Sequence, residues 1–171
     1  MRTTWLTLLF IIALSITATA QVQTFKRDSL EYTLDLPAAS WRPVSRVDVH
    51  EHMEFINGDD RRNGYLRLRK NLVAPGITAA DLFREAEKWE LGRLPGYVAC
   101  SGGLGTEFNG HHRGTVFSYE FVEKGRNMDG RIYYFEFDRR TFYVLHFTVT
   151  SDKLASRRGE MDSIARSFRL K

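Results

Sequence analysis

Residues 131–150 read RIYYFEFDRRTFYVLHFTVT, and this stretch decides the fold class. Arg131–Phe137 and Thr141–Thr150 are two runs of aromatic and β-branched residues, and the polar Asp138-Arg139-Arg140 joins them. Two such runs separated by a short polar connection are typical of a β-hairpin. We therefore predict that these residues form the strongest hairpin of the chain.

The segment that follows the hairpin has the spacing of an amphipathic helix. Ser151 and Asp152 are good N-caps, and a set of apolar residues then recurs on one helical face: Leu154, Met161, Ile164, Ala165 and Phe168. We expect this stripe to face the sheet and to meet three phenylalanines of the hairpin: Phe135, Phe137 and Phe147. Arg157 is expected on the outer face of the helix.

The segments before the hairpin alternate in the same way. The alternating patterns predict strands over four segments: 32–36, which ends at Pro37, 52–56, 64–71 and 115–123. A short strand is expected around 97–100, and a turn over 125–130. Between them, Thr78 and Asp81 predict the capped start of a helix, with an apolar stripe of Leu82, Phe83, Ala86 and Trp89, and Gly92 marks its end. This order of elements predicts an α+β fold, in which helices pack on a mainly antiparallel sheet.

The first twenty residues differ from the rest. Arg2 precedes the apolar run 5–16, and Ala18-Thr19-Ala20 places small residues before Gln21. This is the pattern of a cleaved signal peptide. An uncleaved membrane anchor is the alternative, but the run is shorter than the roughly 20 residues that span a bilayer. We expect residues 1–20 to be removed and the mature protein to work in the periplasm or to be secreted, with no transmembrane segment.

The net charge and the cysteine content limit the kinds of partner and the covalent bonds that we expect for this protein. The net charge of +4 is mildly basic, which suits weak attraction to anionic partners and not nucleic-acid binding. Cys100 is the only cysteine, so no intramolecular disulfide can form. We expect Cys100 to be a small buried apolar residue, with a reactive thiol as the alternative.

Four motifs in this order carry a family resemblance. They are Leu94-Pro95-Gly96-Tyr97, the runs 130–134 and 141–147 inside the hairpin, and Ile164-Ala165-Arg166-Ser167-Phe168. With a first strand that ends at a proline and is followed by Trp41, the chain resembles a PsbP-like domain over about residues 30–170. That family is named for an extrinsic subunit of the photosystem II oxygen-evolving complex.

The resemblance implies an α/β/α sandwich around an antiparallel sheet. It also implies an accessory, stabilising or binding role without catalysis. The photosystem role is not carried over, because plant members dock through a substantial N-terminal segment. We therefore divide the chain into a signal peptide (1–20), a short polar lead-in (21–29) and a single PsbP-like domain (30–171).

Histidines are the first candidates for chemistry. His50 and His52 share a face of a predicted strand, and with Glu54 they offer three ligands; His111 and His112 stand together in a glycine-flanked loop. Zinc needs three or four ligands in a tetrahedron, and nothing in the spacing brings the two pairs together. We predict no metal site and no cofactor.

His146 lies in a hairpin strand on the face of Phe142 and Val144, so we predict a satisfied, partly buried histidine and not a catalytic base. The glycine-rich run 101–105 lacks the Lys-Ser/Thr of a P-loop and the G-x-S-x-G of a nucleophile elbow. Its expected role is to form tight turns.

A basic strand is the last candidate. Tyr65, Arg67 and Arg69 share one face of the predicted strand 64–71, and further basic residues surround them: Arg61, Arg62 and Lys70. Two interpretations stay open, a binding surface for anionic groups and a solvated sheet edge.

We predict a non-enzymatic, exported accessory or binding module of the cell envelope that recognises a protein or an anionic surface. The alternative is a small-ligand binder with an apolar pocket between sheet and helix, lined by Trp41, Trp89 and strand aromatics. A hydrolase is the third possibility, although no nucleophile with a base is identifiable. The candidate site residues are Tyr65, Arg67, Arg69, Trp41 and Trp89.

Overall fold

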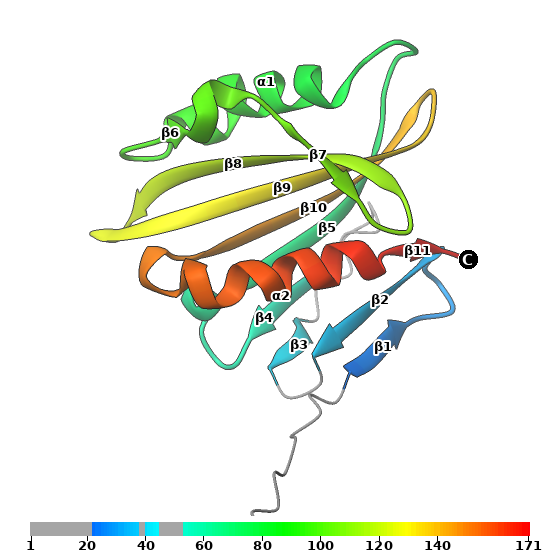
Figure 1. The fold of residues 1–171 in the computed structure, drawn as a ribbon, viewed down its shortest axis with the longest axis horizontal. Coiled ribbons are helices and arrows are strands. Elements are labelled where there is room, and N and C mark those ends of the chain that lie inside the picture. Colours follow the sequence, from blue (N-terminus) through cyan, green and yellow to red (C-terminus); the bar gives the residue numbers. More distant parts are fainter. Residues whose placement is uncertain (1–21, 38–39, 45–52) are drawn as a thin grey trace, which may run out of the picture.

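A long antiparallel sheet forms the middle layer of the protein. The computed structural model describes residues 22–37, 40–44 and 53–171. Within them the sheet runs β3 (Trp41–Val44), β4 (Met53–Asn57), β5 (Tyr65–Leu72), β10 (Thr141–Thr150), β9 (Arg126–Asp138), β8 (Arg113–Glu123) and β6 (Val98–Ala99), with β7 (Thr106–Asn109) also paired to β8. Two helices, α1 (Ala79–Trp89) and α2 (Leu154–Ser167), cover opposite faces (Figure 1). The predicted α+β sandwich is confirmed.

The predicted hairpin is confirmed as the pair β9–β10, which lies in the interior of the sheet between β5 and β8. The expected turn over 125–130 is wrong, because β9 already begins at Arg126. The reversal takes place at Lys124 and Gly125, which both have positive φ, 51° and 76°. A two-residue turn of that handedness lets β8 and β9 pair along almost their whole length.

The α2 face of the sheet holds the larger part of the core. Phe135, Phe147 and Phe168 are buried there together with Met161 and Ile164 of the helix. Phe137 was expected to join them, and that prediction is wrong: its side chain is 55% exposed. It lies beyond the end of α2, and its ring contacts only Tyr143 among the described aromatic residues.

Both ends of α2 differ from expectation. Ser151 and Asp152 do not cap the helix; they form a 3-10 turn, Ser151–Lys153, that leads into Leu154. The helix ends at Ser167, and the following Arg169–Leu170 form the short strand β11. Arg157 is not on a free outer face either, since its guanidinium donates to Glu160 at 2.6 Å.

Strand β11 belongs to a second, three-stranded sheet with β1 (Val22–Lys26) and β2 (Tyr32–Pro37). Only a polar lead-in was expected at residues 21–29, yet β1 pairs there with residues 33–37 of β2. The buried side of β2 packs under α2 and extends the core on that face (Figure 1). Among the described residues, no helix has the length and apolar character needed to cross a bilayer.

Helix α1 covers the other face less completely. Its predicted capping box is confirmed: Thr78 accepts from the backbone N–H of Asp81, whose carboxylate accepts in turn from the N–H of Thr78. The helix buries only Leu82 and Phe83 in full and ends at Trp89, before the predicted stop at Gly92. A 3-10 turn, Leu91–Arg93, follows and inserts Leu91 into the core.

Candidate functional site

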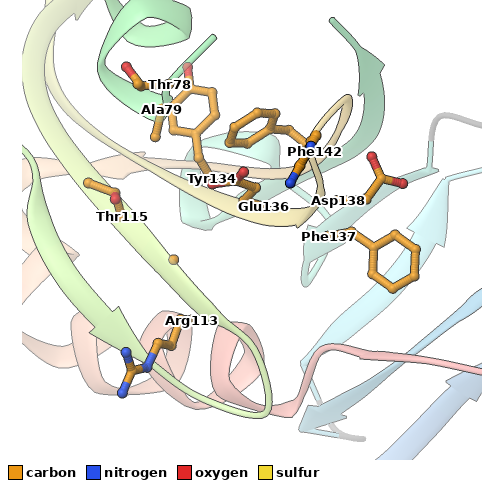
Figure 2. Close-up of a pocket in the computed structure, with 11 residues that line it drawn as sticks. Thr78, Ala79, Arg113, Thr115, Tyr134, Glu136, Phe137, Asp138 and Phe142 are labelled. Carbon is orange, nitrogen blue, oxygen red and sulfur yellow. The ribbon is translucent and has the colours of Figure 1, made fainter. Parts of the chain in front are cut away.

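One hollow of the described surface does not have the character of a site. It has a volume of 550 Å³ and lies beside the tip of the β9–β10 hairpin. Figure 2 shows Thr78, Tyr134 and Phe142 together, Arg113 apart from them on β8, and Phe137 turned away. The hollow is wide open and its charged side chains are exposed, so it offers a ligand little enclosure.

A second hollow of 430 Å³ runs between α2 and β8. The buried Arg131 lies in it and donates to the Tyr133 hydroxyl (3.0 Å), the Ser118 hydroxyl (3.3 Å) and the Asp162 carboxylate (3.0 Å). Three of its donors are therefore used within the protein. This network ties α2 to the sheet, and we regard it as structural.

A smaller hollow of 270 Å³, which we call the α1-side pocket, combines apolar walls with a polar floor. The walls come from the segment after α1 and from strands β8 and β9: Leu91, Leu94, Phe121 and Met128. The floor is formed by side chains of β5, β8 and β10: Tyr65, Arg67, Tyr119 and His146. Glu90, which directly follows α1, stands at its edge.

Sheet register places the floor residues together. Arg67 of β5 is opposite His146 of β10, and Tyr65 is opposite Thr148. Directly paired residues of antiparallel strands point to the same face. The interpretation of β5 as a solvated sheet edge is wrong, because the strand lies between β4 and β10.

Tyr119 reaches His146 across an intervening strand. Its hydroxyl lies 2.5 Å from His146 Nε2. The ring crosses β9 at Gly130, where an added Cβ would lie only 2.1 Å from the ring carbon Cζ. Glycine at position 130 is therefore what permits the contact between Tyr119 and His146.

The protonation state of His146 follows from its surroundings. Burial, followed by the positive charge of Arg67, lowers the pKa of His146 well below its ordinary value, so the ring is neutral at physiological pH. Arg67 Nη2 lies 3.5 Å from Nδ1 and can only donate. The tautomer that satisfies both contacts carries its proton on Nε2 and donates it to the Tyr119 hydroxyl oxygen.

Two guanidinium groups meet a single carboxylate at the edge of the pocket. Arg67 Nη2 donates to Glu90 Oε1 at 2.7 Å, and Arg69 Nη1 lies 3.8 Å from Oε2. Burial alone would raise the pKa of Glu90, but the hydrogen bond from Arg67 and the charges of both arginines outweigh it and hold this pKa below its usual value. The three groups together carry one excess positive charge.

Comparison with known proteins bears on the fold. No protein-family model and no curated protein matches the sequence. Among solved structures, cyanobacterial PsbP from Synechocystis matches with a TM-score of 0.60 and 12% identity, over 94% of this chain and 99% of that one. This chain has a PsbP-like fold.

Other structures share the PsbP-like fold. LpqN, described as involved in cell envelope biogenesis of Mycobacterium tuberculosis, matches with a TM-score of 0.54 and 15% identity, over 88% of this chain and 91% of that one. A protein from Bacteroides thetaiotaomicron matches with a TM-score of 0.55 and 13% identity over 82% of this chain, which spans only 45% of that longer one. At such identities the likeness concerns the fold alone.

Of the five site residues predicted from sequence, three come together on this PsbP-like fold. Tyr65, Arg67 and Arg69 share the α1 face of β5. Trp41 is buried on the opposite face, where its indole N–H donates to Glu160 at 2.8 Å. Trp89 is 56% exposed, so the two tryptophans do not line one pocket.

Tyr119 and Glu90 were not among the residues predicted for the site. Alternation along β8 puts Tyr119 on one face with Phe117 and Phe121, but only the sheet order shows that this face also carries His146. Glu90 has no comparable signal, because its place depends on where α1 ends.

The remaining candidates lie elsewhere. His111 and His112 are in the loop between β7 and β8, and the ring of His112 lies against Phe168. His50 and His52 fall outside the described residues. Within 22–37, 40–44 and 53–171, no group of three or more His, Cys, Asp or Glu is arranged to hold a metal. Cys100 is half-buried in a short 3-10 segment and not deep in the core.

Proposed function

We propose that this protein is a non-enzymatic binding module of the cell envelope that receives a small amphiphilic ligand in the α1-side pocket. The observation that carries the proposal is the meeting of apolar walls with a few convergent polar groups, which is the usual character of a ligand site. The pocket joins Leu91, Leu94, Phe121 and Met128 to a floor of hydrogen-bonded polar side chains.

The chemistry of the lining supports binding over catalysis. Among the described residues that line the pocket there is no serine or cysteine, and Thr148 supplies an aliphatic hydroxyl. Burial with the Glu54 hydrogen bond raises the pKa of Tyr65 to about 12. His146 is neutral and has a partner at each ring nitrogen. A general base needs a free acceptor within reach of a nucleophile, and these side chains do not supply that pair.

Recognition of an extended anionic surface receives less support. Each basic residue around β5 has a carboxylate partner: Arg61 with Glu54, Arg62 with Asp60, Arg67 and Arg69 with Glu90, and Lys70 with Glu31. Exposed cations that are already paired add little to an outward field. The two arginines that share a single carboxylate, Arg67 and Arg69, lie beside the pocket and not on an open face.

The envelope location is part of the same proposal. The predicted signal peptide at residues 1–20 supports it, and so does the likeness to LpqN, which is described as involved in cell envelope biogenesis. Neither observation identifies a binding partner in the envelope.

The test uses 1-octanol as an uncharged amphiphilic probe and residues 21–171 as the protein. Amide NMR titration should show saturable shifts around Leu91, Leu94 and Met128. Leu94→Trp, which fills the pocket, should abolish them, whereas Leu104→Trp on the exposed loop before β7 should not. Absence of saturable shifts, or equal binding by Leu94→Trp, would overturn the proposed function.

A further inference from the structure

We infer, resting on the proposed function, that the ligand of the α1-side pocket is a small monocarboxylic acid whose carboxylate binds Arg67 and Arg69 in the place that Glu90 occupies in the free protein. Glu90 then acts as a built-in competitor. Three lines of observation lead to this assignment: the fixed position of the arginines, the charge around them, and the shape of the pocket.

The guanidinium groups of Arg67 and Arg69 extend from a central strand, whereas the carboxylate of Glu90 lies at the end of a helix. Arg67 and Arg69 extend from β5, which is paired on both sides, and their side chains are 26% and 21% exposed. Glu90 is the residue at which α1 stops, and its side chain is 46% exposed. Glu90 can turn into solvent without moving the sheet, and the arginine pair then stays in place for another carboxylate.

The arginines also have unused donors. Arg67 Nε and Arg69 Nε are buried and have no hydrogen-bond partner among the described residues. A buried donor without an acceptor costs free energy until one is supplied. Arginine presents its donors as a planar fork that suits a carboxylate. The Nη groups that meet Glu90 can therefore receive a ligand carboxylate in its place, whereas the two buried Nε atoms are not open to the pocket.

The other charged groups at the pocket are the paired Arg61 and the carboxylate of Glu123. Arg61 is paired with Glu54 at 2.8 Å. Glu123 also lines the pocket, and His146 contributes no charge because burial holds its ring neutral. The carboxylate of Glu123 offsets the excess charge of the pocket as a whole, so the local feature that an anionic ligand head meets is the guanidinium pair of Arg67 and Arg69.

The walls suit an acyl or aryl tail. A volume of 270 Å³ is about nine times the roughly 30 Å³ that one water occupies in the liquid. The pocket therefore has room for a short acyl or aryl tail, and an eight-carbon acid is a suitable probe. The side chains of Leu91, Leu94, Phe121 and Met128 offer no hydrogen-bonding groups for a peptide backbone, which favours a simple acid over a protein terminus.

The test compares octanoate with 1-octanol at pH 7.5, using calorimetric titration of residues 21–171. Glu90→Gln should raise the affinity for octanoate about tenfold and leave the affinity for octanol unchanged. Glu85→Gln makes the same charge change at an exposed position of α1 and serves as the matched control. Arg69→Gln should weaken octanoate about tenfold and leave octanol unchanged, and it avoids Arg67, which also contacts His146.

The outcomes separate the two claims. If octanol binds but Glu90→Gln changes octanoate affinity no more than Glu85→Gln does, the carboxylate assignment is wrong and the binding function stands. If Glu90→Gln raises the affinity for both octanol and octanoate, Glu90 blocks the pocket by its size and the carboxylate assignment is also wrong. If neither probe binds the parent protein or Glu90→Gln, the proposed function itself fails.

Discussion

Removing the ring of Phe168 should destabilise the protein strongly, because this residue joins α2 to the sheet and to the small sheet. Phe168 is 1% exposed. Its ring stacks on Phe135 at 5.4 Å and contacts Tyr143 at 5.2 Å and Tyr32 at 5.8 Å. These partners come from β9, β10 and β2, so a shift of any one of these strands cannot fill the cavity that Phe168→Ala leaves.

Truncation of a buried phenylalanine to alanine typically costs about 3–5 kcal/mol, out of a total stability of about 5–15 kcal/mol. For a domain of this size, each kcal/mol lowers the melting temperature by about 2–4 °C. We therefore expect Phe168→Ala to melt about 6–20 °C below the parent protein, with a matching loss in urea denaturation.

The effect of Phe168→Ala is compared with that of an exposed substitution on the same helix. Arg157 is unsuitable, since its partner Glu160 also holds the indole of Trp41. Ser163 is exposed on α2, and Ser163→Ala should change the free energy of unfolding by less than about 0.5 kcal/mol. If Phe168→Ala and Ser163→Ala melted alike, the docking of α2 through this ring would be refuted.

Three further predictions concern the α1-side pocket and processing. Because burial lowers the pKa of His146, only the unfolded chain takes up a proton on this side chain below about pH 6.5. Between pH 7.5 and 5.5 the parent protein should therefore lose about 1.4 kcal/mol more stability than His146→Gln. Equal losses for the two proteins in urea melts would contradict this prediction. Gly130→Ala should lower stability by about 1–3 kcal/mol as Tyr119 is displaced, whereas Gly159→Ala, with open space around its Cα, should raise it by about 0.5–1 kcal/mol in the same melts. Intact-mass analysis of protein from its native host should show Gln21 as the first residue, and a retained Met1 would exclude cleavage.

Elements with strong local signals could be predicted from sequence. The β9–β10 hairpin and the Thr78–Asp81 capping box depend on neighbouring residues, and both form as expected. Exposure could not be read from the same patterns. Trp89 has the helical spacing of a core residue, but α1 ends at that point. Its exposed ring instead makes cation–π contacts with Lys88 and Arg93.

The candidate site could be predicted only in part, because it depends on pairing between distant segments. Alternation placed Tyr65, Arg67 and Arg69 on one face of a strand. Whether that strand lies at an edge or inside the sheet depends on the order β4-β5-β10, which local sequence does not encode. The same order brings in His146, 79 residues away from Arg67 along the chain.

The two faces of the sheet differ in how completely they are covered, and we propose that this difference separates stability from binding. On one face, α2 and the small sheet close over an aromatic cluster that includes Phe135, Phe147 and Phe168. On the other, α1 ends at Trp89 and leaves the Arg67–His146 end of the sheet covered only by the turn around Leu91. A helix one or two turns longer would fill this space. The early end of α1 thus leaves the space in which we propose that a ligand binds, and it places Glu90 beside the arginine pair that we assign to the ligand's carboxylate.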